Sequence, residues 1–557
     1  MTVNYVLGKS FSNKFNLSKN DTIVISGTYF FRDINFSSLQ NKIKNNAIET
    51  LGSICRFLDG SFFLFYYDDL NDDFWFVTDP YGLNKVFYQV SNNVIKISDD
   101  INDFFDDKIA RLDTDGINEY LRFLDISPPK TCYEGIFVLD GSKYLRVSLK
   151  TKKFELYNSI IASSPISKVG FSEAVNNTRS ILVKALERRL EKVERVGLFL
   201  SGGVDSSILA ALYSELINNY NFEKVKSYAV GFNNKELDES PIAEAVASNL
   251  GISHEVLKFD IEQEYYAFFN ICSLLDVPFA DPAVIPTYLT MNQMRLDGIT
   301  SVMEGTGADG LIGATLPKFY NRILKIEQFL HPVFRNLIAD ILRNSGDPFG
   351  YLSYFDFENI EEKFIRWKGW KRKEIEKLCG QACDLSGTAF YRIFKEYRNG
   401  DSYDLYRKLL VGMPDSRITD TCRLLGLQPV FPFFDQELRD FVESLPREYK
   451  SLNGENKRLF KALLAQYVPR DIWDVPKHGF DYPFEKLLLY RDADLVNRYL
   501  NRGMLEQHNL FSLDLVMDCK SRFIEGDTDL KFKIWALVVF QAWYDNFYRL
   551  HGDGLSR

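Results

Sequence analysis

Short apolar runs alternate with polar and turn-forming residues over the first 155 positions, a pattern typical of β-strands. The runs are Ile23–Gly27, Ser61–Tyr67, Phe74–Val77, Val86–Val90 and Val94–Ile97. A helix is predicted at Thr114–Leu124, before a break at Ser127-Pro-Pro129. We therefore expect an α+β layered domain in this part of the chain.

The pattern changes after residue 170, where apolar strands alternate with amphipathic helices. Helices are predicted at Phe171–Leu190, Ile208–Tyr220 and Pro241–Leu250, and strands at Arg195–Leu200, Lys224–Gly231 and His254–Phe259. This alternation predicts a doubly wound parallel sheet that binds ligands beyond the carboxyl ends of its strands. From about residue 320 the chain is largely helical, with aromatic-rich amphipathic stretches.

A polar segment rich in small residues, Ser159–Gly170, separates the two patterns, and we interpret it as a linker. The predicted division is therefore a first domain over 1–158, a linker over 159–170 and a second domain over 171–557.

Composition restricts the function classes. The chain has 557 residues, 46% hydrophobic and 26% charged, as in ordinary soluble globular proteins. Its net charge of -9 argues against broad binding to nucleic acid or anionic membranes. The seven cysteines are scattered and odd in number, which favours a reducing compartment. No signal peptide and no membrane-length apolar run is evident, so we expect a cytoplasmic protein.

The most specific signal is the segment Val196–Ser207, which predicts a strand, then the turn Ser201-Gly-Gly203, then Asp205-Ser-Ser207 at the opening of a helix. Glycines permit a sharp turn and a close approach to phosphate, and a helix N-terminus favours anions. Asp205 fits as a ligand for Mg²⁺ carried in with a nucleotide. The pattern S-G-G-x-D-S resembles the PP-loop of ATP pyrophosphatases and lacks the ending of a Walker loop. The alternative is an ordinary capped helix after a strand.

A second cluster of glycine and acidic residues, Glu304–Gly313, follows the apolar run Ile299–Met303. Asp205 and Asp309 thus stand on two strand-end loops, as a metal bridging the phosphates of ATP requires. Each cluster alone could be a turn, but the two together in a predicted α/β sheet favour a nucleotide site.

With these motifs the chain resembles the asparagine synthetase family, including its β-lactam synthetase and lasso-peptide cyclase relatives. The matches to the family's glutaminase-type domain are Leu58–Phe62, Asp79–Gly82, Lys85, Tyr88 and Tyr120–Phe123. The matches to its synthetase domain are the Ser201 loop, Val230–Phe232, Asp238-Glu239, Asp281-Pro282, Glu304–Gly313, Pro432–Asp435, Lys457 and Pro476–Phe480. The resemblance implies an Ntn-hydrolase-like fold for the first domain and a PP-loop ATP pyrophosphatase fold, with added helices, for the second.

The resemblance also implies a reaction. A carboxylate attacks the α-phosphorus of ATP to form an acyl-adenylate, and an amine then converts it to an amide and AMP. The residues expected to bind the nucleotide are Ser201, Gly202, Gly203, Asp205, Ser206, Val230 and Gly305, with Asp205 and Asp309 holding Mg²⁺. Lys457 matches the family lysine that stabilises charge during catalysis, although it could also be a surface residue of a helix.

The chain departs from the family where glutamine chemistry resides. Glutamine-using members begin with a cysteine after Met removal, and this chain has Thr2. The family's Asn-Gly-Glu reads Ser26-Gly27-Thr28, and its Arg-Gly-Pro arm is missing. We therefore interpret the first domain as a degenerate glutaminase that does not hydrolyse glutamine.

The second domain departs from the family around the expected acceptor site. Thr306 stands where members carry Glu, Tyr or His, and it cannot act as an effective general base. Gly310, Gln428 and Val430 replace a Glu, a Glu and an Arg. These changes leave the ATP motifs intact and alter the aspartate pocket.

The leading hypothesis is therefore an ATP-dependent, AMP-forming amide synthetase whose amine does not come from glutamine. Lactam or lasso-type closure of a small-molecule or peptide carboxylate fits best, with a precursor peptide or partner protease as possible partners. The alternatives are an asparagine synthetase that uses ammonia or glutamine, and a non-catalytic ATP-binding homologue. His478, in the Pro476–Phe480 motif, is a minor catalytic candidate.

Overall fold

The structure is a computed structural model of the full chain. It describes residues 4–7, 23–91, 94–105, 111–141, 143–151, 153–159, 166–220, 226–232, 234, 238–313, 334, 337–338, 341, 364–365, 369–398, 402–413, 416–452, 454–475 and 482–548. Thr2 and the Pro476–Phe480 motif with His478 lie outside the described residues.

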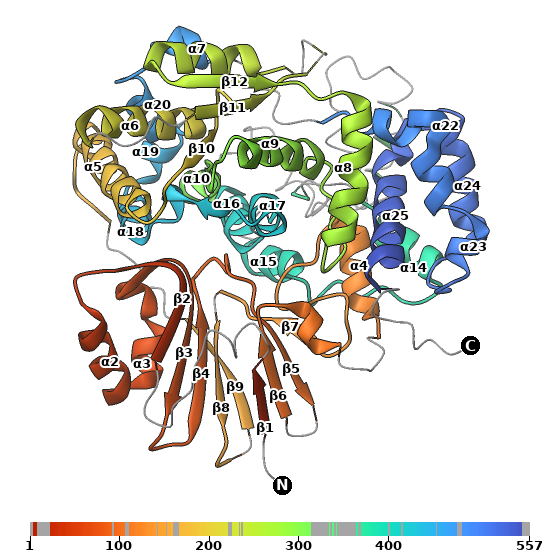
Figure 1. Ribbon diagram of the computed structural model, residues 1–557, viewed down its shortest axis with the longest axis horizontal. Coiled ribbons are helices and arrows are strands. Elements are labelled where there is room, and N and C mark those ends of the chain that lie inside the picture. The colour runs from red at the N-terminus through yellow and green to blue at the C-terminus, as the bar shows by residue number, and fades with distance from the viewer. Residues whose placement is uncertain are drawn as a thin grey trace.

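Two sheets form the N-terminal half (Figure 1). One is five-stranded and antiparallel, in the order β2 (Ile23–Phe31), β3 (Leu58–Asp68), β4 (Asp73–Thr78), β8 (Lys143–Ser148) and β9 (Lys153–Asn158). The other is four-stranded, in the order β1 (Asn4–Leu7), β6 (Val94–Ser98), β5 (Phe87–Ser91) and β7 (Ile136–Val138). This architecture confirms the predicted α+β layered fold.

Side-chain alternation along β3 explains the layers. Phe63 and Phe65 point toward the second sheet and form a core with Ile95 and Ile97 of β6. The intervening residues of β3 face the helices α2 (Phe36–Asn45) and α3 (Ala47–Gly52) on the opposite side. Because both faces of β3 are buried, its sequence reads as a nearly continuous apolar run.

A five-stranded parallel sheet organises the C-terminal half. Its order is β12 (Ser253–Leu257), β11 (Lys226–Val230), β10 (Val196–Phe199), β13 (Ser301–Met303) and β14 (Gln428–Val430). One face packs against α5 (Phe171–Leu190), α6 (Val204–Tyr220) and α20 (Arg458–Leu464), and the other against α9 (Val284–Leu296) and α17 (Arg417–Leu425). The predicted doubly wound sheet is therefore confirmed.

The order of the strands locates the binding crevice. From β10 the chain builds outward through β11 to β12, and it then returns to add β13 and β14 on the other side of β10. The crevice at the carboxyl ends of β10 and β13 is therefore the topological switch point, where open α/β sheets bind ligands. The Ser201 and Glu304 loops follow these two strands.

The remaining helices belong partly to the N-terminal half and partly to the C-terminal half that contains the parallel sheet (Figure 1). They are η1 (Ile54–Arg56), η2 (Ile101–Phe104), α4 (Thr114–Phe123), α7 (Ser240–Leu250), α8 (Ile261–Leu274), α10 (Ala308–Ile312), α14 (Arg372–Cys379), α15 (Ala389–Tyr397), α16 (Ser402–Gly412), η4 (Pro432–Phe434), α18 (Gln436–Ser444), α19 (Arg447–Lys450), α21 (Arg470–Trp473), α22 (Glu485–Tyr499), α23 (Arg502–Leu505), α24 (Leu513–Ile524), η5 (Thr528–Leu530), α25 (Lys531–Trp543) and η6 (Tyr544–Tyr548).

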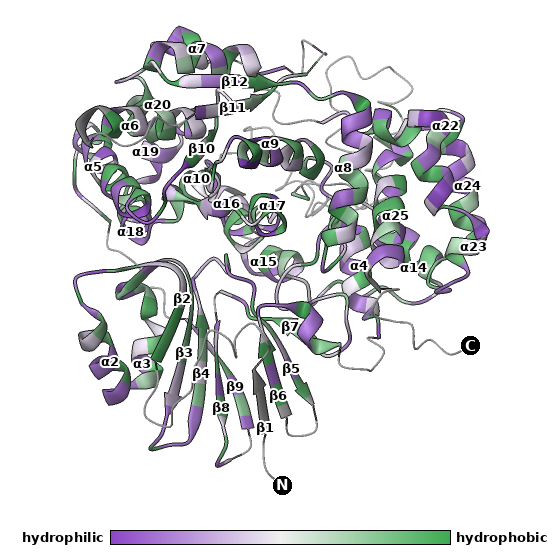
Figure 2. Cartoon of the chain, viewed as in Figure 1, coloured by the Kyte–Doolittle hydropathy of each residue, from purple (hydrophilic) through white to green (hydrophobic). Residues whose placement is uncertain are grey.

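Helix α25 is the centre of the helical region. Most of its side chains are buried, whereas α22 and α24 at the outer edge carry hydrophilic stretches (Figure 2). Tyr120 of α4 donates a hydrogen bond of 2.7 Å to the carbonyl oxygen of Ala536 in α25, so the two halves are joined here. None of the described helices combines the length and apolarity needed to cross a bilayer.

Candidate active site at the switch point of the parallel sheet

The loop after β10 is shaped by one glycine. Gly202 has a φ of +73°, and a Cβ atom there would lie 2.7 Å from Cγ2 of Ile242 on α7. Only glycine satisfies both the positive φ and this close approach. Helix α6 begins at Val204, four residues before the predicted range Ile208–Tyr220. Asp205 and Ser206 lie in its first turn, which confirms that they open the helix.

Hydrogen bonds within the Ser201 loop hold it in place. The backbone N–H of Ser201 donates to Oγ of Ser206 at 3.2 Å, and the two hydroxyl oxygens are 3.1 Å apart. The N–H of Gly203 donates a hydrogen bond of 3.4 Å to Oγ of Ser201. Since α6 starts at this loop, the positive end of its dipole favours an anion such as a phosphate.

The Glu304–Gly313 loop packs directly against the Ser201 loop, as the sequence predicted. A Cβ atom on Gly305 would lie 3.1 Å from Cβ of Asp205. Gly307 has a φ of +98°, and its Cα faces the ring of Phe434 in η4, where a Cβ would lie at 3.0 Å. Gly305 therefore allows the loops after β10 and β13 to approach each other, and Gly307 makes room for the ring of Phe434.

Lys457 joins the two loops electrostatically. Its Nζ lies 2.5 Å from Oδ2 of Asp205 and 2.7 Å from Oδ1 of Asp309. Lys457 precedes α20 and has a left-handed backbone, with φ of +57°. Burial opposes the charge of this lysine, but the carboxylates of Asp205 and Asp309 raise the pKa of Lys457 well above its ordinary value. The ammonium is therefore charged at neutral pH.

The two carboxylates fit Mg²⁺ that arrives with a nucleotide. Mg²⁺ in nucleotide sites takes one or two carboxylates and completes its shell with phosphate oxygens and water. Within the described ranges no group of three or more His, Cys, Asp or Glu side chains could hold a metal by itself. Asp205 and Asp309 thus suit an ion that depends on phosphate for its remaining ligands.

A cavity of about 770 Å³ opens from the switch point toward the N-terminal half. The predicted site residues that line it are Ser201, Gly203, Asp205, Ser206, Val230, Gly305 and Asp309. Gly202 and Lys457 do not line the cavity. Gly202 sets the shape of the Ser201 loop, and Lys457 pairs with the carboxylates of Asp205 and Asp309. Away from the loops the wall of the cavity is largely apolar, with Phe123, Phe279, Phe364, Phe390, Leu409, Val411 and Met413.

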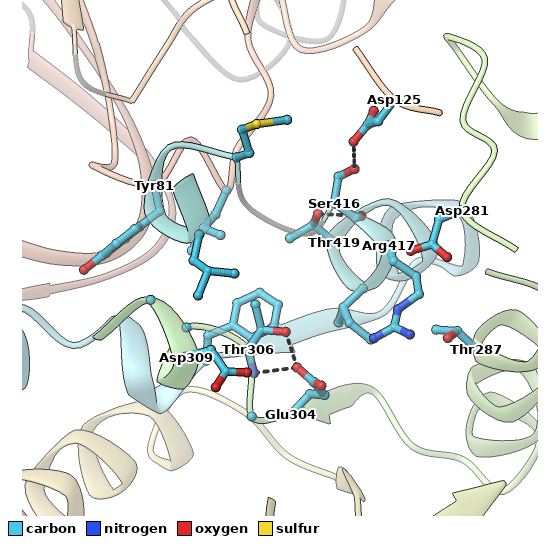
Figure 3. Close-up of a pocket in the computed structure, with 18 of the residues that line it drawn as sticks. Tyr81, Asp125, Asp281, Thr287, Glu304, Thr306, Asp309, Ser416, Arg417 and Thr419 are labelled. Carbon is cyan, nitrogen blue, oxygen red and sulfur yellow. Dashed lines mark hydrogen bonds between the residues drawn. The ribbon is translucent and has the colours of Figure 1, made fainter. Parts of the chain in front are cut away.

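Glu304 is a site residue that the sequence reasoning did not assign. It follows β13 directly, lines the cavity, and accepts hydrogen bonds at Oε2 from both the backbone N–H of Thr306, at 2.6 Å, and the Thr306 hydroxyl (Figure 3). Thr306 is no base itself, but it fixes a carboxylate beside Asp309. The sequence feature that could have identified Glu304 is its position immediately after a predicted strand at the switch point.

Polar groups from other elements face the same cavity (Figure 3). Arg417, at the start of α17, lies between Asp281 and Glu304 in this view. Asp125 accepts a hydrogen bond of 3.0 Å from Oγ of Ser416, and burial raises the pKa of Asp125 to about 7. Where α16 packs on α10, a Cβ on Gly310 would lie 3.1 Å from Cγ2 of Val411, so a larger side chain there would displace Val411.

Other family-matched residues have structural roles. Oδ1 of Asp435 accepts the backbone N–H of Leu438 at 3.1 Å and caps α18. Oδ1 of Asp281 accepts the N–H of Ala283 at 2.9 Å, just before α9. Cys383 packs into the helical core and Cys379 against it.

The segment Ser26–Thr28 lies within β2, and Gly27 pairs with Phe62 of β3. The hydroxyl of Thr28 accepts a hydrogen bond from the side-chain amide of Gln428 in β14. A cavity beside Thr28, Gly60 and Ser61 measures about 20 Å³. That volume holds about one water molecule.

Comparisons with known proteins complete the description. Residues 177–545 match the family model described as asparagine synthase. A putative glutamine-hydrolysing asparagine synthetase of Mycobacterium bovis is 22% identical over 521 residues, covering 88% of this chain and 77% of that protein. Glutamine-hydrolysing asparagine synthetase 1 of Bacillus subtilis is 20% identical over 490 residues, covering 84% of this chain and 74% of that protein. The structure of NMN synthetase from Francisella tularensis matches with a TM-score of 0.19 and 14% identity, covering 26% of this chain and 58% of that one.

Proposed function

The chain belongs to the asparagine synthase family, and from that premise we propose a specific reaction for it. Members of this family are ligases that form carbon–nitrogen bonds while converting ATP to AMP and pyrophosphate, so the protein is an enzyme of this class. We propose that it activates a carboxylate larger than aspartate, and that the attacking amine comes from a source other than glutamine. Closure of a lactam or macrolactam is a reaction of this kind.

The position of Lys457 between Asp205 and Asp309 carries the proposal. In the first step a carboxylate oxygen bonds to the α-phosphorus of ATP, and the bond to the departing pyrophosphate breaks. The Ser201 loop and the start of α6 hold the phosphates, and a charged ammonium stabilises the developing negative charge. Asp205 and Asp309 would hold Mg²⁺, which when bound neutralises charge on the phosphates.

Glu304 supports the second step. The amine nitrogen bonds to the carbonyl carbon of the acyl-adenylate, the bond to AMP breaks, and one proton leaves the nitrogen. A carboxylate in the cavity, oriented by the N–H and hydroxyl of Thr306, is suited to accept this proton. We assign this role to Glu304.

The walls of the cavity beyond the nucleotide loops favour a carboxylate larger than aspartate. The volume of about 770 Å³ has to hold ATP together with the carboxylate, so the chemistry of the remaining wall decides which carboxylate fits. Aromatic and aliphatic side chains such as Phe123, Phe390 and Leu409 would gain by covering apolar substrate surface. Aspartate has no such surface to bury.

The N-terminal half supports an amine source other than glutamine. Thr28, which stands in place of the Glu of the family's Asn-Gly-Glu, is engaged by Gln428, and within the described residues the cavity beside it holds about one water molecule. A second candidate function is nevertheless asparagine synthesis, because the relatives with long alignments bear that name.

An amine-source assay separates these functions. Purified protein is incubated with ATP, Mg²⁺ and glutamine, with and without aspartate, and glutamate release is measured. The proposal predicts no glutamate above a heat-inactivated blank. Glutamate release coupled to asparagine formation would overturn the proposed amine source and establish asparagine synthesis.

A further inference from the structure

The Lys457 ammonium occupies the space between the two carboxylates that suit a metal ion. We propose that Lys457 keeps divalent cations out of the Asp205–Asp309 pair until ATP binds, and so couples metal loading to nucleotide loading. The inference rests on the proposed function only in that this site binds ATP and a divalent cation.

Geometry gives the reason for exclusion. Nζ of Lys457 contacts one oxygen of each carboxylate, at 2.5 Å and 2.7 Å. A cation bound to both carboxylates would have to occupy nearly the same position. At such short separations, repulsion between the ammonium and a divalent ion is strong in a partly buried site. The ion must therefore displace the ammonium or bind elsewhere.

The backbone of Lys457 is fixed, so displacement concerns the side chain alone. The residue adjoins α20, whose Leu459, Phe460, Leu463 and Leu464 are fully buried in the core beneath the sheet. The lysine stem itself is flexible and its head has three donors. Its side chain is 22% exposed, so the ammonium is not fully enclosed and can leave the carboxylates by a change of rotamer.

Phosphate supplies the alternative partner for the ammonium. Without nucleotide, two carboxylates and one ammonium leave a net charge of -1, which disfavours release of the only cation in this triad. ATP bound at the Ser201 loop adds negative charge beside the triad, so an ammonium and a metal can both be accommodated. Nucleotide binding thus raises metal affinity, and linkage requires that metal raise nucleotide affinity by the same factor.

Removing the charge of Lys457 tests the inference through binding alone. Mn²⁺ serves as the probe, and its affinity is measured by calorimetry or by the electron paramagnetic resonance of free Mn²⁺, with and without a non-hydrolysable ATP analogue. The variants are Lys457→Gln and the double variant Lys457→Gln/Asp205→Asn. The matched control is Lys461→Gln, one turn further along α20, where the lysine pairs with Asp474.

The wild-type protein is expected to bind Mn²⁺ roughly tenfold or more tightly with the analogue than without it. Lys457→Gln is expected to bind Mn²⁺ alone more tightly than wild type by a similar factor, and to lose most of the nucleotide dependence. The double variant should lose this gain, and Lys461→Gln should behave like wild type.

Two results would overturn the inference. One is an Mn²⁺ affinity of folded Lys457→Gln, in the absence of nucleotide, that equals or falls below that of wild type. The other is found with the wild-type protein alone, namely an affinity for Mn²⁺ that is the same with and without the ATP analogue. Neither depends on the carboxylate substrate, so failure here is distinct from failure of the proposed reaction.

Discussion

Arg189 of α5 lies 3.3 Å from the carboxylate of Asp59 in β3, measured from Nη2 to Oδ2, and so joins the two halves of the protein. The same guanidinium contacts Oδ2 of Asp435 at 3.0 Å through Nη1. All three side chains are buried. Burial raises the pKa of Asp59 above its ordinary value, whereas at Asp435 the guanidinium groups of Arg189 and Arg188 outweigh burial, lower the pKa and keep the carboxylate ionised.

Replacement of Arg189 is expected to destabilise the protein strongly. Arg189→Met leaves the Asp435 carboxylate buried with less compensation, at a cost of about 3–5 kcal/mol. Arg188→Met is the matched control, because Arg188 contacts the same carboxylate at 2.6 Å from a position that is 32% exposed. Thermal unfolding should show the larger loss for Arg189→Met. Equal melting temperatures for the two variants would contradict the structural role assigned to Arg189.

A methyl group on Gly202 is expected to damage both stability and nucleotide binding. In Gly202→Ala the new Cβ would clash with Ile242, and the backbone has a φ of +73°. In Gly251→Ala the backbone has a similar φ of +66°, but no atom lies within 4 Å of the new Cβ. The left-handed backbone alone costs about 1–2 kcal/mol. Gly251→Ala should therefore lose stability only, and Gly202→Ala should also bind ATP roughly tenfold more weakly by calorimetry. Unchanged ATP affinity in Gly202→Ala would argue against a phosphate-binding role for this loop.

The sequence predicted elements whose local pattern was strong. The helix predicted at Phe171–Leu190 has those bounds as α5, because its amphipathic pattern and turn-forming flanks are local features. Strand β14 was not predicted, since its three residues include Pro429 and pair with β13, more than 100 residues earlier in the chain. Helix α6 begins at Val204, next to Asp205-Ser-Ser207, which the sequence placed at the opening of the helix.

The sequence predicted the part of the candidate site that is formed by glycine- and aspartate-containing loops. The approach of Asp205 and Asp309 followed from their positions after two strands. Resemblance assigned Lys457 a role in stabilising charge, and only the structure shows that it lies between the two carboxylates. The position of Glu304 after a predicted strand could have marked it as a site residue, but its role could not be assigned, because the sequence does not show that its side chain folds back onto Thr306. Asp435 was matched as a motif residue, but the structure shows that it caps a helix and pairs with two arginines.

Glu304→Gln is expected to slow amide formation selectively. The substitution keeps the shape of the side chain and removes the proton acceptor, which corresponds to a loss of about 10²–10⁴-fold. Carboxylate-dependent ATP–pyrophosphate exchange, which reports the first step alone, should change by a few-fold at most. Thr306→Val should give a smaller loss in the same step. Thr419→Val is the control, since this hydroxyl in the cavity wall donates to the backbone of Ser416. Equal losses in exchange and amide formation for Glu304→Gln would contradict the assigned role.

His508 is expected to make the stability depend on pH. Its Nδ1 accepts the backbone N–H of Leu510 at 3.0 Å, and burial among aromatic rings lowers the pKa of His508 from 6.5 to about 4. Between these values the unfolded chain binds the proton and the folded protein does not. The free energy of unfolding should therefore fall as pH decreases from about 6.5 through about 4.

The variant His508→Gln tests this dependence, because glutamine stays neutral beside Gln541. Its melting temperature should change less than that of wild type over the same acid range. Parallel pH profiles for the two proteins would show that other groups cause the acid sensitivity.

Carboxylate-dependent exchange of labelled pyrophosphate into ATP tests the central claim most directly. The assay compares aspartate with larger apolar carboxylates, such as N-acyl amino acids and short peptides, in the presence of Mg²⁺. Asp205→Ala provides the blank. Exchange above the blank with a larger carboxylate, and not with aspartate, is the predicted result. Exchange with aspartate alone, or no exchange with any carboxylate in a protein that binds ATP, would contradict the proposal.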